Sequence, residues 1–310
     1  MTAPDTVELR DAACEFARAA GAILLEGYGR VHAPEKKGRI DLVTEYDRRS
    51  EAMLLGLIRK RFPEHGILAE ESGVHPGAPA GGASRPGPSA PDPRAAGAGS
   101  GQAEVAGSNH AEVADPRHHA ARWLCDPLDG TTNFAHNYPF FCVSVGVEVA
   151  GTMAAAAVYD PVRDELFAAA AGAGATLNAT PIRVSDIPRV EDALLVTGFP
   201  YDVREHPEKH LPLFQDFLLR AQGVRRDGSA ALNLCYVAMG RFDGMWEGNL
   251  SPWDIAAGSL IVREAGGVIT GYVGEPLRLD GRRIVTANPA LHALMLEVVG
   301  THPEAGRGGV

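Results

Sequence analysis

The chain has few of the features that mark a secreted, membrane-spanning or nucleic-acid-binding protein. Its cysteines lie far apart and form no C-x-x-C pair, which favours reduced thiols in a cytoplasmic protein. No apolar run is long enough to cross a bilayer, and the start lacks the basic and apolar regions of a secretory signal. No block of basic residues interrupts the formal charge of −10, so we expect no direct contact with nucleic acid.

One long stretch lacks the residues that build a hydrophobic core. Between Gly73 and Ala121 there is no aromatic residue, leucine or isoleucine, and alanine, glycine, proline and serine dominate. Such a composition cannot offset the entropy that is lost when a backbone is ordered. We therefore predict a single domain over residues 1–310, interrupted by a disordered insertion at 73–121 and ending in a frayed tail at 301–310.

The rest of the chain has enough apolar residues for a core, since 45% of the whole is hydrophobic. Apolar residues at helical spacing predict helices at about 6–28, 47–62, 207–221, 229–239, 253–265 and 289–299. Apolar or alternating runs predict strands at 66–69, 140–149, 152–159, 165–169, 193–197 and 283–287. Helices and strands alternate without a repeat, which indicates a mixed α/β fold.

The most informative segment is residues 123–134, with the sequence W-L-C-D-P-L-D-G-T-T-N-F. A buried strand is expected to end at Asp126, and Asp129 follows on a turn that contains proline and glycine. Thr131 and Thr132 then supply hydroxyl and backbone N–H groups where a short helix can begin. Carboxylates at a strand end beside free N–H groups suit hard cations together with a phosphate.

Six acidic residues are candidates for one site: Asp47, Glu70, Glu71, Asp126, Asp129 and Asp254. Each also has an ordinary explanation as a helix-capping side chain, a turn residue or an exposed charge. Glu70 and Asp126, however, each follow a buried apolar run. Carboxylates about 4 Å apart repel by about 4 kcal/mol per pair at an effective dielectric of about 20, so converging strand ends would need cations. Oxygen ligands favour Mg²⁺, Mn²⁺ or Ca²⁺ over zinc.

Two such cations would clamp the attacking and leaving oxygens of a phosphate ester. Other phosphate chemistries fit the sequence less well. Cys235 and Arg241 have the spacing of a cysteine-phosphatase loop, but Tyr236 and Val237 are too bulky for a phosphate to approach the backbone. No P-loop and no complete dinucleotide-binding glycine motif is present. A metal-activated water remains as the nucleophile.

These motifs resemble the inositol monophosphatase family, in the wider superfamily that includes fructose-1,6-bisphosphatase. The matching pieces are D-L-V-T at 41–44 with Asp47, G-I-L-A-E-E at 66–71, the 123–134 segment, and W-D-I-A-A-G at 253–258. The likeness runs from residue 7 to about 299, interrupted by the insertion. It implies a layered αβαβα fold, a homodimer, two or three Mg²⁺ ions per site with Mn²⁺ as a substitute, and inhibition by Li⁺.

The resemblance also implies the metal ligands, residue by residue. Glu70, Asp126 and the carbonyl of Leu128 would hold the first ion. Asp126, Asp129 and Asp254 would hold the second ion, which would steady the leaving oxygen.

The remaining site residues follow from the same resemblance. Thr131, supported by Asp47, would orient the attacking water, and Glu70 would help to deprotonate it. Glu71 would shape the surroundings of the ions, and Lys36 lies in the loop that closes over the site in relatives. The contacts to phosphate and substrate would come from Gly130, Thr131, Thr132, Gly228, Ser229, Ala230 and Glu247.

The resemblance implies a Mg²⁺-dependent phosphomonoesterase that acts on a small phosphorylated substrate, with myo-inositol monophosphate as the first expectation. A sibling phosphatase is an alternative, because residues 248–251 are small and polar; its substrate would be fructose bisphosphate, histidinol phosphate or a nucleotide 3′-phosphate. Glu247 as an ordinary surface charge is also open. A regulatory protein that keeps the fold and binds protein partners is a second alternative, although the complete acid set favours catalysis.

Overall fold

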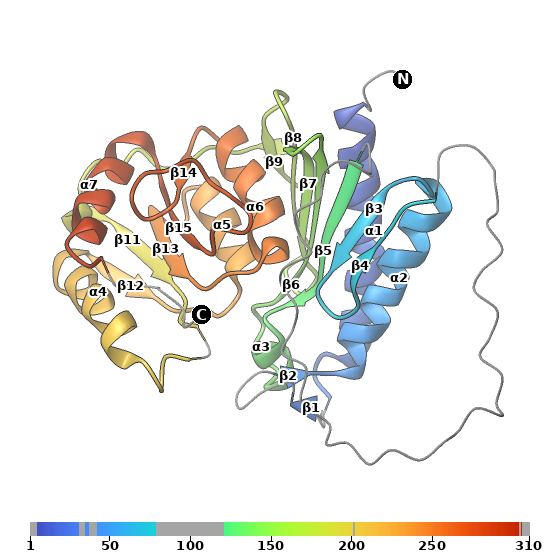
Figure 1. Ribbon diagram of the computed structural model, residues 1–310, viewed down its shortest axis with the longest axis horizontal. Helices are drawn as coiled ribbons and strands as arrows, with labels where there is room; N and C mark the ends of the chain where they lie inside the picture. Colours follow the sequence, from blue (N-terminus) through green and yellow to red (C-terminus); the bar gives the residue numbers. More distant parts are fainter. Residues whose placement is uncertain are drawn as a thin grey trace, which may run out of the picture.

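The computed structural model describes residues 5–30, 35–36, 42–78, 121–200, 202–303 and 305. An eight-stranded sheet and a five-stranded sheet alternate with three layers of helices, as Figure 1 shows. This arrangement confirms the mixed α/β class and the layered αβαβα fold.

The first helical layer consists of α1 (Thr6–Gly27) and α2 (Glu45–Arg61), which pack against each other and against the larger sheet. The apolar face of α1 is buried, including Leu9, Phe16 and Leu24. Helix α2 begins two residues earlier than expected. The reason is a capping box, in which Thr44 caps the helix and the Asp47 carboxylate accepts from the Thr44 N–H at 2.8 Å.

The larger sheet has the order β10-β9-β8-β7-β6-β5-β3-β4. Within it, β3 and β5 are parallel and all other neighbouring strands are antiparallel. Because Ala69 pairs with Cys125, the residues that follow, Glu70 and Asp126, lie side by side. The strands are β3 (Gly66–Ala69), β4 (Gly73–His75), β5 (Ala121–Asp129), β6 (Cys142–Val149), β7 (Thr152–Asp160), β8 (Glu165–Ala170), β9 (Ala175–Leu177) and β10 (Thr180–Pro181).

The alternation of side chains along β5 sets the direction of Asp126. Trp123 and Cys125 belong to the hydrophobic cluster on the α1 side, whereas Leu124 packs with the helices of the middle layer. Successive side chains of a strand point to opposite faces, so Asp126 shares the face of Leu124. A charged side chain is thereby directed into the centre of the molecule, where it is 2% exposed.

The middle layer and the smaller sheet complete the fold. Helices α5 (Ala230–Ala238) and α6 (Pro252–Glu264) lie between the two sheets, and α4 (Pro207–Arg220) and α7 (Pro289–Gly300) cover the outer face (Figure 1). The smaller sheet contains β12 (Gly223–Arg225), β11 (Leu194–Thr197), β13 (Gly244–Gly248), β15 (Arg283–Ala287) and β14 (Val268–Thr270), in that order. The short elements outside these layers are β1 (Glu35–Lys36), β2 (Leu42–Val43), α3 (Thr131–Ala135) and η3 (Val190–Asp192).

Helix α5 also decides the question of a cysteine phosphatase loop. Cys235 lies within this helix, and every residue from Ala230 to Ala238 is buried. A helix buried on all sides leaves no room for a phosphate around the cysteine, so the spacing of Cys235 and Arg241 has no catalytic meaning.

The expected limits of the insertion and of the tail are wrong. Gly73–His75 forms β4 against β3, and β5 begins at Ala121, so only residues 79–120 lie outside the described chain there. Strand β4 was missed because its pairing uses backbone groups, which composition does not report. In the tail, Ala305 is 3% exposed and packs against the cluster that contains Val298. Strand β5 also continues beyond Asp126 to Asp129, with a shift in register between them.

In the described part of the chain, no helix combines the length and the apolar character that a membrane span requires.

Candidate metal and phosphate site

A pocket of about 170 Å³ lies where the end of β5, the start of α3 and the starts of α5 and α6 meet. It brings together most of the residues that the sequence singled out, although they are spread over almost two hundred positions. These residues are Glu70, Asp126, Leu128, Asp129, Gly130, Thr131, Thr132, Gly228, Ala230, Glu247 and Asp254.

Four carboxylates of this pocket influence one another. Burial raises the pKa of Asp126 well above its usual range, and the charges of Glu70, Asp129 and Asp254 raise it further. Burial is likewise the largest cause of the raised pKa of Asp254, followed by the charge of Asp129. Burying like charges together is unfavourable unless a cation or a proton compensates them. The pocket is therefore electrostatically suited to positive charge.

Backbone N–H groups fix one oxygen of three of these acids. Asp126 Oδ1 accepts from the Leu128 N–H at 3.0 Å. Asp129 Oδ2 accepts from the Ala231 N–H at 2.7 Å, and Asp254 Oδ2 accepts from the Ser251 N–H at 2.8 Å. The last bond belongs to the capping box of α6, so Asp254 caps a helix and also lines the pocket. Each side chain is held in one orientation while its second oxygen stays outside these bonds.

The donor chemistry fits a hard cation such as Mg²⁺, because the lining includes the carboxylates of Glu70, Asp126, Asp129 and Asp254. Among the residues that the structure describes, no three acidic, histidine or cysteine side chains are already drawn together as a metal-ligand cluster. The carboxylates line a shared cavity from the end of β3, from β5 and from α6 instead. The residues that would hold a cation are thus gathered by the fold, and backbone N–H groups anchor Asp126, Asp129 and Asp254 separately.

The start of α3 forms another side of the pocket. Gly130 has a φ of +100°, and a Cβ at this position would lie 2.9 Å from the Phe140 carbonyl oxygen, so only glycine fits here. Its conformation turns the chain from β5 into α3, whose first N–H groups have no acceptor within the helix. The Thr131 hydroxyl lies 3.0 Å from both Asp47 Oδ1 and the Leu128 carbonyl oxygen.

Glu247 occupies the opposite wall, at the end of β13. Burial, followed by the charge of Asp129, raises the pKa of Glu247 to about 8, and Arg226 acts in the other direction. Its Oε2 is buried and has no hydrogen-bond partner among the described residues. A Cβ at Gly198 would lie 1.9 Å from Glu247 Oε1, so the carboxyl packs directly on that glycine. The interpretation as an ordinary surface charge is therefore wrong.

Two predicted site residues lie outside the pocket lining, and the side chain of a third is not described. Ser229 is 1% exposed and does not line the pocket, because its hydroxyl donates to Asp129 Oδ2. Glu71 lies beside a different hollow, and its N–H donates to Glu51 Oε2 at 2.8 Å. Lys36 ends β1, but its side chain lies outside the described residues. Asp47 stands behind Thr131, as expected for a supporting residue.

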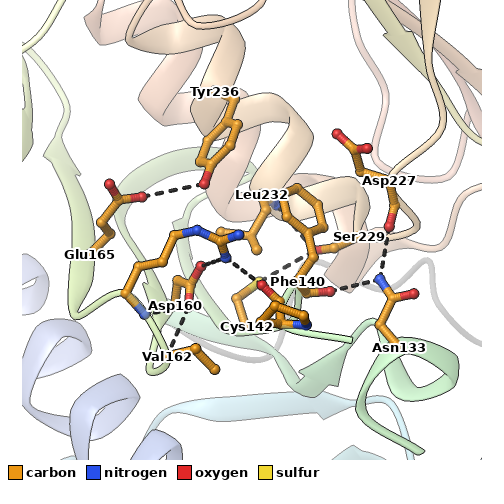
Figure 2. Close-up of polar contacts among 12 residues, drawn as sticks. Asn133, Phe140, Cys142, Asp160, Val162, Glu165, Asp227, Ser229, Leu232 and Tyr236 are labelled. Carbon is orange, nitrogen blue, oxygen red and sulfur yellow. Dashed lines mark hydrogen bonds and ion pairs between the residues drawn. The ribbon is translucent and has the colours of Figure 1, made fainter. Parts of the chain in front are cut away.

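Other residues of the pocket were not predicted as individual contacts. Arg226 is the one cationic side chain among the described lining residues. Asn133 joins α3 to the segment before α5, because its Nδ2 donates to the carbonyl oxygens of Phe140 at 2.7 Å and Asp227 at 2.8 Å (Figure 2). Arg226 could have been predicted as a pocket residue from the sequence, because it lies two residues before Gly228. The complete set is Asn133, Gly198, Phe199, Pro200, Arg226, Gly248, Asn249 and Leu250.

Comparisons with known proteins show what this chain is similar to. An inositol-1-monophosphatase of Synechocystis is 41% identical over 293 residues, which cover 94% of this chain and 88% of the relative. A putative Nus factor SuhB of Neisseria meningitidis serogroup B is 38% identical over 292 residues, covering 94% of this chain and 97% of the relative. The solved inositol monophosphatase of Anabaena has a TM-score of 0.76 and 39% identity, with 96% of this chain and 97% of that chain covered.

The sequence pattern of the inositol monophosphatase family matches residues 5–304. This match spans nearly the whole chain and includes every acid of the pocket. The chain therefore belongs to the inositol monophosphatase family.

Proposed function

We propose that this chain is a Mg²⁺-dependent phosphomonoesterase that hydrolyses myo-inositol monophosphate to inositol and phosphate. The observation that carries the proposal is the meeting of Glu70, Asp126, Asp129 and Asp254 in one pocket beside the start of α3. Buried like charges call for cations, and the free N–H groups of a helix start suit a phosphate. Divalent cations would neutralise the carboxylates, and a phosphate ester bound to these cations would accept hydrogen bonds from the N–H groups.

In this proposal the metal ligands are divided as the family resemblance implies. Glu70, Asp126 and the Leu128 carbonyl would hold one cation, and Asp126, Asp129 and Asp254 would hold another. When bound, the cations supply the positive charge that neutralises the carboxylates and stabilises the phosphate as its ester bond breaks.

The chain's own groups handle the water and the phosphate. The Thr131 hydroxyl orients the attacking water, and the carboxylate of Asp47, 3.0 Å away, fixes that hydroxyl. Glu70 accepts the proton that the water loses. The N–H groups of Gly130, Thr131 and Thr132 bind phosphate oxygens and stabilise the charge that grows on them.

The alcohol part of the substrate lies against Glu247, Gly228 and Ala230. The buried Glu247 Oε2 has no hydrogen-bond partner among the described residues, so the carboxyl is placed to bond to the hydroxyl groups of a polyol. This wall supports a hydroxyl-rich substrate over an apolar one.

The test is phosphate release from a panel that contains myo-inositol 1-phosphate, fructose 1,6-bisphosphate, histidinol phosphate and a nucleotide 3′,5′-bisphosphate. We expect Mg²⁺-dependent release that is fastest with the inositol ester and is suppressed by Li⁺. Faster release from another member would keep the reaction type and replace the substrate.

A second candidate is a regulatory role through protein partners in transcription, which is supported by the 38% identity to a relative named as a putative Nus factor. Uniformly negligible release across the panel, with the fold intact, would favour this role over the phosphatase.

A further inference from the structure

Asp129 is held firmly at one of its two oxygens. Oδ2 accepts hydrogen bonds from the Ser229 hydroxyl at 2.7 Å and from the Ala231 N–H at 2.7 Å. The thiol of Cys142, a weak donor, lies 3.9 Å from the same oxygen. The backbone N–H of Ala230 also donates to the Asp129 carboxylate. These donors together fix the orientation of the Asp129 side chain, which lines the pocket.

The Ser229 hydroxyl is placed to act through Asp129 and not on a substrate. It is 1% exposed and does not line the pocket. It donates to Asp129 and lies 3.4 Å from the Leu232 N–H, for which it is the N-cap acceptor of α5. Figure 2 shows Ser229 inside the protein, linked to Cys142 and Leu232.

The bond between Asp129 and Ser229 joins two layers of the fold. Asp129 ends β5 of the larger sheet, whereas Ser229 precedes α5 of the middle layer, 100 residues later. A second connection between the same two regions runs from the Asn133 side chain to the Asp227 carbonyl oxygen, 2.8 Å away. Only the first of these hydrogen bonds involves a carboxylate of the pocket. A substitution at Ser229 or at Asn133 therefore removes one connection and leaves the other.

We propose that Ser229 is a positioning residue that locks the side chain of Asp129, so that the carboxylate is presented to a divalent cation in the pocket. This role replaces direct substrate contact for Ser229, and it rests on the proposed function because it takes Asp129 as a metal ligand. A carboxylate that is already oriented loses less freedom when it binds a cation. Groups that orient metal ligands in this way typically contribute 10- to 100-fold to metal affinity.

The experiment measures Mn²⁺ binding to the folded protein in the absence of any substrate, from the electron paramagnetic resonance signal of free Mn²⁺. The variants are Ser229→Ala, Ser229→Thr, Cys142→Ala and Asn133→Ala. We expect Ser229→Ala to raise the Mn²⁺ dissociation constant at least about tenfold. Ser229→Thr keeps the hydroxyl, so it should stay within about threefold of the wild type, as should the other two.

Loss of the helix cap has to be separated from loss of positioning. The melting temperature of the metal-free protein reports the contribution of the helix cap. This temperature should fall for Ser229→Ala whether or not the residue positions Asp129. The dissociation constant reports the positioning. If Ser229→Ala does not fold, Ser229→Cys keeps the volume with a weaker donor and should raise the constant by an intermediate factor.

Two results would overturn the proposal: Mn²⁺ binding of folded Ser229→Ala that equals the wild type, or an equal loss in Asn133→Ala, which would indicate general loosening. A wild-type protein that binds no Mn²⁺ would instead remove the metal centre, and with it the proposed function.

Discussion

Thr131 and Asp47, 84 residues apart in the sequence, meet at 3.0 Å between Thr131 Oγ1 and Asp47 Oδ1. The other oxygen of Asp47 is held by the N–H and hydroxyl of Thr44, at 2.8 and 2.6 Å. Asp47 is thus anchored to the first turn of α2 through Oδ2 and holds the pocket threonine through Oδ1. One side chain both caps a helix and supports the site.

The replacement Asp47→Asn should lower kcat by about 100-fold or more, because an amide has a single acceptor oxygen and cannot accept from both the Thr131 hydroxyl and Thr44. Stability should fall by about 1 kcal/mol through the weakened capping box. Kinetics at saturating Mg²⁺ and urea unfolding measure the two effects.

Asp243→Asn is the matched control for that variant. Asp243 is also a buried acid that accepts from a backbone N–H, that of Leu194 at 2.6 Å, but it directly precedes β13 and does not line the pocket. The Asp243→Asn variant should be less stable than the wild type and have the same kcat. An Asp47→Asn enzyme with wild-type kcat would contradict the role of this contact.

Glu247 should give stability a measurable pH dependence. Its pKa rises from an ordinary 4.5 to about 8 on folding, so between these values the folded protein holds a proton that the unfolded chain releases. The stabilisation from this proton is full below pH 4.5 and is lost as pH rises towards 8, by at most about 1.4 kcal/mol per pH unit.

The comparison with Glu247→Gln isolates this group from the other acids of the pocket. In EDTA, the unfolding free energy of the variant minus that of the wild type should increase with pH across this window and level off above it. A difference that stays flat from pH 5 to pH 9 would show that Glu247 titrates normally, contrary to its raised pKa.

The segment 79–120 should be replaceable by a short linker. His75 pairs with Ile67 and Arg122 pairs with Gly66, so β4 and β5 flank the same end of β3, about 10 Å apart. About six flexible residues span this distance. Closing a shorter loop costs less entropy, so stability should be unchanged or rise by about 1–2 kcal/mol, with kcat unaffected.

The cut has to begin after Ala78, because the Ala78 N–H donates to the Pro63 carbonyl oxygen at 2.7 Å. Circular dichroism melting and phosphate release check the outcome. A loss of folding or of most of the rate would mean that the segment has a structural or catalytic part.

The long elements were predictable because their burial leaves a clear period in the sequence. Helix α1 and strands β6 and β7 end close to their expected limits for this reason. In the smaller sheet β11 and β15 were predicted, whereas β12, β13 and β14 were not, since three to five residues such as Gly244–Gly248 carry no readable period. Strand β4 was hidden by a glycine-rich composition, because backbone pairing needs no apolar side chain.

Residues of the site were predictable where local sequence already fixes their direction. Asp126 and Glu70 follow strands whose parallel pairing brings them together. Ser229 and Glu71 are different, because the motif gives their neighbourhood but not the direction of the side chain. Packing turns Ser229 inward to Asp129, and the N–H of Glu71 binds Glu51, which no spacing rule reports.

The central claim is that divalent cations compensate the buried acids of the pocket. The most direct test compares the unfolding free energy of the wild type and of Asp126→Asn as Mg²⁺ is added. Without Mg²⁺, Asp126→Asn should be as stable as the wild type or slightly more so, because one of the repelling carboxylates is gone. With Mg²⁺ at 100 times its dissociation constant the wild type should gain about 2.7 kcal/mol, and the variant far less. Two curves that rise equally, or a wild type that gains nothing, would contradict the account.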